Sequence, residues 1–433
     1  MFIKEKGLKI YNNNKVIFQN FTYITFLQLF LLLTPLFTYP YLVRILGREL
    51  YGLVITAQVV ASYCSLFVDF GFKSISARDI SIHRDNKDKL SEILCSILSI
   101  RFLIWIFSLI AYMGVIFLVP EYKTHLLLFI CAFGLTFNEL LFPQFFFQGI
   151  EKMKYISILN ISLRSMFVVF IFLFVRRPEQ YYFVPLFTSI GNFLGGVVSL
   201  YIIFKKEKIK WFIPQWSSMK IYLKDASPIF ATDLICSIKD KFSYILLGSI
   251  MGMSDVVIYD LGAKFNSILT RPMGIIGIVL FPKIAKERNI RLFKKTALYS
   301  FIGVVLIVIV VNIFLPQLAS FFLDGEISSL LPLRLFLIVP AVLSISGFIA
   351  SNLLIALGYN IYILYSIIIT TIVYLGMLAI FYFSGALNSV TSFVVIALVS
   401  YVAEFIYRLF KSFRVFRDEA AAKAELLKLQ NNL

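Results

Sequence analysis

The sequence predicts an all-α polytopic membrane protein whose twelve transmembrane helices form two pseudo-symmetric six-helix lobes around a central cavity. First, 60% of the 433 residues are hydrophobic and only 15% are charged, whereas soluble proteins contain roughly 45–50% apolar residues. Second, apolar runs of about 20 residues, long enough to cross a bilayer as a helix, recur along the chain. The predicted spans are 16–43, 50–72, 91–118, 125–147, 155–175, 181–204, 226–251, 255–282, 293–322, 330–357, 361–383 and 389–410.

The Lys and Arg residues predict the orientation of these spans. With twelve spans the two termini share one side, and that side carries 27 of these residues against five on the other. Cytoplasmic loops of membrane proteins are enriched in basic residues, so we expect both termini in the cytoplasm. The membrane topology thereby explains the net charge of +17. Because the basic residues have this explanation, we expect no nucleic-acid partner.

The longest basic loop suggests the domain organisation, because it divides six spans from six. We expect a cytoplasmic tail over 1–15, an N-lobe over 16–204, a basic linker over 205–225, a C-lobe over 226–413 and a cytoplasmic tail over 414–433. The last tail contains EAAAK, which resembles an engineered helical spacer, so part of it is excluded from functional reasoning.

The two lobes resemble each other in sequence. RILGRELYGLVITAQ (44–58) and YILLGSIMGMSDVVIYDLGAKF (244–265) both place Leu–Gly before a short linker and a Tyr/Gly pair. The spans that follow also end in similar sequences, which are FGFKSISARDI (70–80) in the first lobe and LFPKIAKERNI (280–290) in the second. Duplicated bundles are common among transporters, whose substrate sites lie near the middle of the membrane.

Charged residues inside the spans indicate a hydrated cavity. Lys239, Asp240 and Lys241 lie near the middle of span seven, where a charge that faces lipid costs roughly 2.5–3.5 kcal/mol. Residues spaced i, i+4, i+7 and i+11 share one face of a helix. Such stripes contain Asp233, Ser237, Asp240, Lys241 and Tyr244 in span seven, Asp260, Lys264, Ser267 and Arg271 in span eight, and Gln58, Ser62, Ser65 and Asp69 in span two.

These residues are the candidate functional groups, and structural ion pairs are the alternative interpretation. Basic groups in a cavity suit an anionic ligand, and we assign Arg101, Arg164, Lys241, Lys264 and Arg271 to this role. Acidic groups pair with the bases or take part in ion coupling or gating. The candidates for ion coupling or gating are the acids Asp69, Glu139, Asp233, Asp240 and Asp260, together with the base Arg78. Lys239 points elsewhere and is expected to face a neighbouring helix. The two His and four Cys residues form no metal or catalytic pattern, so neither a metal nor a cofactor is expected.

Four stretches resemble the O-antigen (Wzx-type) flippases of the multidrug/oligosaccharidyl-lipid/polysaccharide (MOP) exporter superfamily. They are PLFTYPYLVRILGRELYGLV, SLFVDFGFKSISARDIS, FFQGIEKMKYISILNI and DKFSYILLGSIMGMSDVVIYDLGAKF, in the expected order within about 16–415. The motif positions that carry over are Arg44, Gly47, Asp69, Gly71, Arg78, Asp240, Lys241 and Lys264. In the lipid II flippases of the same superfamily, the first helix contains basic residues. This chain has Thr38–Tyr39–Pro40 there instead, so its sequence departs from that branch of the superfamily.

The resemblance implies a MATE-like fold with a V-shaped cavity and a non-enzymatic activity. It implies transfer of undecaprenyl-pyrophosphate-linked oligosaccharide from the cytoplasmic to the periplasmic leaflet of the bacterial inner membrane. H+ or Na+ as a coupling ion, and the polysaccharide polymerase and chain-length regulator as partners, are left open.

Two other functions remain as alternatives. A cation-coupled drug antiporter of the same superfamily would favour an acidic cavity, whereas this one is at least as basic as acidic. A membrane enzyme such as a polymerase or glycosyltransferase would need a large polar loop with catalytic residues. The predicted exoplasmic loops, GRELYG and RRPEQ among them, are too short for that.

Overall fold

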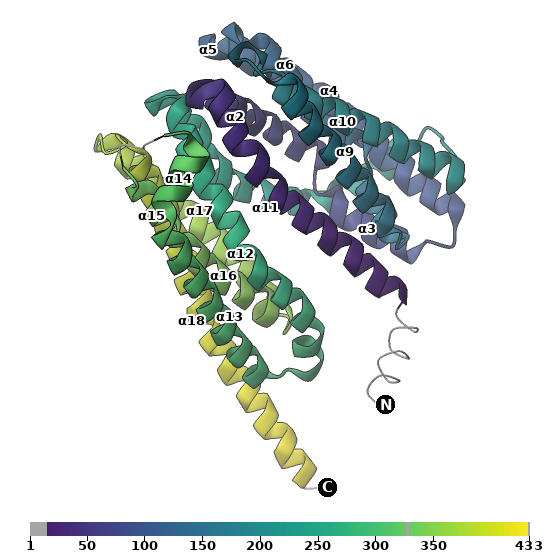
Figure 1. Cartoon of the computed structure of the whole chain (residues 1–433). Coiled ribbons are helices and arrows are strands. Elements are labelled where there is room, and N and C mark those ends of the chain that lie inside the picture. The colour runs from purple at the N-terminus through teal and green to yellow at the C-terminus, as the bar shows by residue number, and fades with distance from the viewer. Residues whose placement is uncertain (1–14, 326–328, 432–433) are drawn as a thin grey trace, which may run out of the picture. The chain divides into compact units, whose positions relative to one another are not determined.

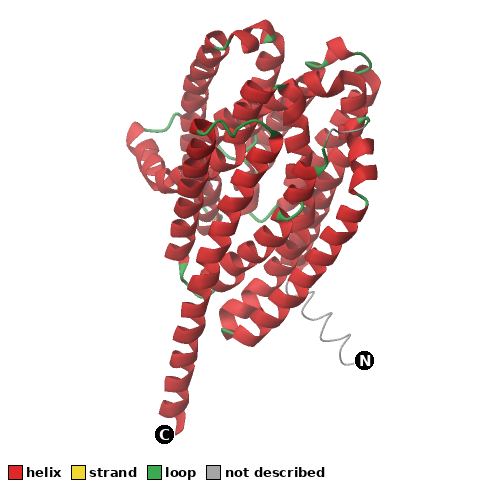
Figure 2. Cartoon of the chain, turned by 90° about the vertical axis from the view of Figure 1, so that its left-hand side faces the viewer, coloured by secondary structure: helices red, strands yellow, loops and turns green. Residues whose placement is uncertain are grey.

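The computed structural model describes residues 15–325 and 329–431. These residues form helices joined by short loops, and no strand occurs among them (Figure 1, Figure 2), as the all-α prediction requires. The chain divides into two compact units, Met1–Leu234 and Ile235–Leu433. The predicted tail 1–15 lies outside the described residues except for Lys15, where the first helix begins.

The first unit contains α2 to α10 and the start of α11. The bounds of these elements are α2 Lys15–Asp69, α3 Phe72–Ile82, α4 Lys87–Leu118, α5 Pro120–Thr124, α6 Leu126–Phe133, η1 Gly134–Thr136, α7 Phe137–Leu141, α8 Gln144–Gly149, α9 Met153–Phe174, η2 Pro178–Gln180, α10 Phe183–Tyr201, η3 Ile202–Lys206 and α11 Trp216–Met251. The boundary between the units therefore falls inside α11.

The second unit contains the rest of α11 and all later helices. Their bounds are α12 Met253–Glu287, α13 Ile290–Ile313, α14 Leu315–Leu323, α15 Leu331–Phe336, α16 Val339–Ile349, η4 Ala350–Ile355, α17 Asn360–Phe383 and α18 Val390–Asn431.

The helices are compatible with twelve membrane spans. Within the described residues, nine helical runs are long and apolar enough to cross a membrane. The first of them, Thr22–Ile82, contains most of the first predicted span (16–43) and all of the second (50–72). The charge-bearing helices α11 and α12 are not among these nine runs.

In each unit, two consecutive helical segments meet at a glycine. The backbone conformation of that glycine would be strained for any other residue. Gly47 lies inside α2 with φ 75° and ψ 164°, and Gly252 joins α11 to α12 with φ 106° and ψ 164°. This region of backbone space is essentially restricted to glycine. The two glycines therefore share one backbone conformation, as equivalent positions of the predicted repeat would. Gly248, which follows Leu247 as Gly47 follows Leu46, is an ordinary helical residue and lacks this conformation.

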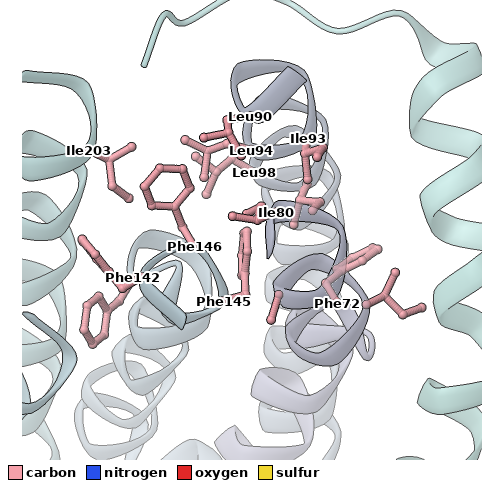
Figure 3. Packing of buried hydrophobic residues seen from close by; sticks show 14 of the residues in the cluster. Phe72, Ile80, Leu90, Ile93, Leu94, Leu98, Phe142, Phe145, Phe146 and Ile203 are labelled. Carbon is pink, nitrogen blue, oxygen red and sulfur yellow. The ribbon is translucent and has the colours of Figure 1, made fainter. Parts of the chain in front are cut away.

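A hydrophobic cluster holds the end of the second span in place. Figure 3 shows Phe72 and Ile80 of α3 packed with Leu94 of α4 and with Phe145 and Phe146 of α8, and all five side chains are buried. The side chains come from three helices that follow or flank the end of α2. The cluster therefore fixes the position of Asp69, the last residue of α2, relative to α4 and α8.

The basic linker is tied to the first unit by polar contacts. The backbone N–H of Lys210 donates to Ser91 Oγ of α4 at 3.1 Å. Lys152, at the start of α9, contacts the carboxylate of Glu207 at 2.6 Å. These bonds connect the segment after η3 to α4 and to the start of α9, so the linker follows the surface of the first unit before α11 begins.

Candidate functional site

The first charged site lies where the second predicted span ends. After Asp69, the left-handed residues Phe70 and Gly71 turn the chain into α3. The Oδ1 atom of Asp69 lies 2.5 Å from Nη2 of Arg101 on α4. Arg101 is only 1% exposed, so this carboxylate compensates a fully buried guanidinium.

Two further contacts fix the Arg101 guanidinium. Its Nη1 donates to the backbone oxygen of Glu139 at 2.7 Å, and its Cζ lies 5.0 Å from the centre of the Phe145 ring. The Glu139 side chain accepts a 2.7 Å hydrogen bond from Asn138 Nδ2 and lies within electrostatic range of Asp69. The charge of a buried cation has to be compensated, and the carboxylate of Asp69 does this for Arg101. The Nε–H of Arg101 has no hydrogen-bond partner among the described residues. Arg101 therefore connects α2, α4 and α7.

A cavity of about 330 Å³ lies beside Glu139, within the first unit. Its lining includes Arg164 of α9, whose guanidinium forms no ion pair with a described residue. The other polar groups that line it are Asn138, Gln144, Asn160, Thr188 and Asn192. Glu139 is the one carboxylate in the cavity lining. Among the described residues there is no group of three His, Cys, Asp or Glu side chains that could hold a metal ion.

The second unit carries a charged stripe on α12. Lys264 forms an ion pair with Asp260, one turn earlier, and Tyr244 of α11 donates to Oδ1 of Asp260 at 3.3 Å. Asp260 is buried, Lys264 is half-buried and Arg271 is exposed. The stripe therefore runs from a compensated interior pair to an accessible guanidinium.

A second interior network of the same unit centres on Glu404 of α18. One of its carboxylate oxygens lies 2.5 Å from Nη1 of Arg408. The other accepts from Thr370 Oγ1 of α17 at 3.0 Å and lies 3.7 Å from Nζ of Lys239 on α11. Glu404 and Arg408 are 5% and 7% exposed, so this network belongs to the core of the second unit.

Nearly all hydrogen-bonding groups of the Glu404 network have partners, and the charges of the network sum to zero. Arg408 donates through Nε to Ser366 Oγ and through Nη1 to Ser346 Oγ, both at 3.0 Å. Lys239 also lies 3.5 Å from Asp240. Two cations and two carboxylates therefore balance, of which Glu404 and Arg408 are buried and Asp240 is exposed. The buried part of the network stabilises the fold as long as each member keeps its partner.

The family of the chain follows from a direct comparison of sequences. Residues 17–288, well over half of the chain, match the family model described as polysaccharide biosynthesis protein. The chain belongs to the polysaccharide biosynthesis protein family. This assignment confirms the resemblance to polysaccharide exporters that the sequence motifs predict.

Two curated relatives of this family member share the name "Putative O-antigen transporter". The one from Escherichia coli (strain K12) is 26% identical over 275 residues, which cover 63% of this chain and 66% of that protein. The one from Shigella dysenteriae is 26% identical over 330 residues, which cover 75% of this chain and 83% of that protein. The chain thus spans just under two thirds of the length of the first relative.

Solved structures confirm the fold of this family member. The lipid II flippase MurJ in an inward closed conformation gives a TM-score of 0.71 at 13% identity, covering 91% of this chain and 87% of that one. An inward-facing MATE family transporter of the MOP superfamily gives 0.62 at 15% identity, covering 89% and 96%. At such identities the likeness concerns the fold alone, and it confirms the MOP/MATE-like architecture.

The structure places the remaining predicted residues at different depths. Arg78 is exposed on α3 and pairs with Asp79 at 2.9 Å. Asp233 of α11 is half-buried, within electrostatic range of Asp69. Lys241 is half-buried, whereas the neighbouring Asp240 is exposed and accepts from Tyr401 Oη at 3.2 Å. Lys239 faces α18, as predicted.

Glu404 and Arg408 are absent from the predicted site residues. The predicted cytoplasmic count includes Arg408 as a residue that flanks span twelve, although the structure buries it among α16, α17 and α18. The sequence signal that could have identified this pair is the i, i+4 spacing of an acid and a base inside the span 389–410, because residues four apart are neighbours on a helix.

We expect Asp69 and Arg101 to be strongly coupled in stability. Asp69→Asn or Arg101→Gln alone leaves an unpaired buried group, which costs about 3–5 kcal/mol. The double variant should lose clearly less than the sum of the single losses. Unfolding of the purified protein in detergent would measure this cycle. The pair of the exposed Arg78 and the half-buried Asp79 is the control, and a surface pair contributes about 0–1 kcal/mol. Additive losses at Asp69 and Arg101 would contradict the assignment.

Proposed function

We propose that this family member is a flippase for undecaprenyl-pyrophosphate-linked oligosaccharide. The observation that carries the proposal is the set of polar groups inside otherwise apolar membrane helices, at the cavity near Arg164 and along the α12 stripe. Membrane proteins retain such groups mainly on substrate or ion pathways. The names of the two curated relatives support the same class of cargo.

The bases of α11 and α12 are the proposed contacts of the pyrophosphate. A diphosphate carries about two negative charges, and each charge-assisted hydrogen bond contributes about 1.5–3 kcal/mol. Lys241, Lys264 and Arg271 supply such donors. Asp260 pairs with Lys264 in this structure, so arrival of the pyrophosphate would exchange one anionic partner for another. This exchange keeps binding weak enough for release.

Arg101 and Arg164 take different roles in this proposal. Arg101 is buried and already paired with Asp69, so it positions the first unit's helices and does not meet the cargo in this conformation. Arg164 lines the cavity and is available to a ligand. Asp69 and Arg78 remain proposed elements of a cytoplasmic gate.

Ion coupling is proposed for the acidic groups within the helices. Glu139 lines the cavity, and Asp233, Asp240 and Asp260 lie on α11 and α12. Carboxylates inside membrane helices are typical of H+ and Na+ pathways. An imposed pH or Na+ gradient across proteoliposomes would distinguish the two ions by its effect on the flipping rate.

A cation-coupled drug antiporter is the second candidate, because a MATE transporter shares the fold. The family assignment and the bases of α11 and α12 favour the flippase. Uptake of a cationic dye, with no flipping of a lipid-linked sugar, would reverse this preference.

We expect Arg271→Ala and Lys264→Ala each to reduce flipping at least tenfold, because one charge-assisted hydrogen bond to phosphate is lost. Arg271→Lys should keep part of the activity, since the charge remains. Lys286→Ala, at an exposed lysine on the same helix, is the matched control and should leave the rate unchanged. Fluorescent lipid-linked oligosaccharide in proteoliposomes would provide the measurement. Full activity of both alanine variants would refute the proposed pyrophosphate contacts.

We propose the bacterial inner membrane as the location, with both termini in the cytoplasm. Single cysteines placed in 252–255 or 384–389 should then react with an impermeant thiol reagent from the periplasm. Cysteines placed in 205–210 should not react in intact cells. The reverse pattern of labelling would invert the proposed orientation.

A further inference from the structure

The cavity of the first unit has a lining that differs from the charged sites elsewhere in the molecule. Five of its polar groups are uncharged: Asn138, Gln144, Asn160, Thr188 and Asn192. They come from four helices, α7 to α10. The only charges in the lining are Glu139 and Arg164, one of each sign. The cavity is therefore polar but has no net charge.

The hydrogen bonds made inside the protein use only part of what these side chains offer. Nδ2 of Asn160 donates to the Ile156 oxygen at 2.8 Å, and Nδ2 of Asn192 donates to the Leu135 oxygen at 3.2 Å. Thr188 Oγ1 donates to the Val184 oxygen at 3.2 Å. An amide has two N–H donors and an oxygen acceptor. Each amide thus retains a donor and an acceptor, and the hydroxyl retains acceptor capacity.

This lining fits a sugar better than it fits the other chemical groups of the cargo. A sugar hydroxyl both donates and accepts, which matches amides and a hydroxyl. A pyrophosphate only accepts and carries about two negative charges. It would need more cations than Arg164 alone, in a lining that also contains the carboxylate of Glu139. A drug-sized apolar ligand would need a predominantly hydrophobic lining. The rest of the lining is Leu31, Leu135, Leu163, Phe167, Phe187 and Gly191, which supplies apolar surface for the C–H groups of a pyranose.

We propose that this cavity binds a sugar residue of the oligosaccharide, separately from the bases that bind the pyrophosphate. The inference rests on the proposed flippase function and adds a saccharide subsite to it. The volume of about 330 Å³ is at the small end of the range for ligand pockets, so the subsite takes a small part of the oligosaccharide. Arg164 then binds sugar hydroxyls, or the carboxylate of an acidic sugar.

The test compares fluorescent lipids with and without sugar in proteoliposomes. The probes are bare undecaprenyl pyrophosphate and the same lipid bearing a neutral hexose, an N-acetylhexosamine or a uronic acid. The wild-type protein should flip at least one sugar-bearing probe about tenfold faster than the bare lipid. Asn160→Leu and Thr188→Val should each slow that sugar-bearing probe about tenfold, as expected for loss of hydrogen bonds to a bound ligand, and leave the bare lipid unaffected.

Asn312→Leu provides the matched control, because Asn312 is a half-buried amide of α13, outside the cavity. It should change neither rate. Equal slowing of bare and sugar-bearing lipids by Asn160→Leu and Thr188→Val would show a structural role and overturn the subsite. The subsite would also be overturned if the wild-type protein flipped the bare lipid as fast as every sugar-bearing probe. The proposed flippase function would stand in that case. Flipping of none of the probes would remove the proposed function and the subsite together.

Discussion

Compensation of charge inside the membrane is the constraint on which this structure depends. An isolated charge at the bilayer centre costs roughly 2.5–3.5 kcal/mol on the insertion scale, and removing one partner of a buried pair costs about as much or more. The four charged residues that are buried among the described ones, Arg101, Asp260, Glu404 and Arg408, each form an ion pair. Arg101 is held by Asp69 in the first unit, and Lys239 and Arg408 are held by Glu404 in the second. The helices are therefore joined by ion pairs as well as by apolar packing.

The same rule separates structural charges from functional ones. The Glu404 network is buried, neutral and bonded to hydroxyls on two further helices, so a ligand could enter only by breaking it. The cavity near Arg164 is different, because its wall keeps hydrogen-bonding capacity that the protein does not use. The α12 stripe is intermediate, with a pair at Asp260 and Lys264 and an exposed Arg271. Cargo recognition is expected at the last two places.

The fold and the presence of interior charges could be predicted from the sequence, but their depth and partners could not. Apolar runs fix the helices, and helical spacing identifies the Asp260, Lys264 and Arg271 stripe. Spacing defines a face, however, and cannot tell which neighbouring helix covers it. The sequence therefore places Arg101 in a cavity, although the structure buries it against Asp69. Arg408 is missed for a related reason, since a base near a span end looks like a cytoplasmic flank.

The central claim is that the first unit keeps a hydrated, cargo-binding cavity among helices whose other charges are compensated. Cysteine labelling tests it directly, in a chain whose four native cysteines are replaced. Asn160→Cys should react with a small water-soluble thiol reagent, and the lipid-linked sugar should slow that reaction. Ser400→Cys, at a fully buried position of α18, should stay unreactive. An Asn160→Cys variant as inert as Ser400→Cys, or one whose labelling the lipid-linked sugar leaves unchanged, would contradict the account.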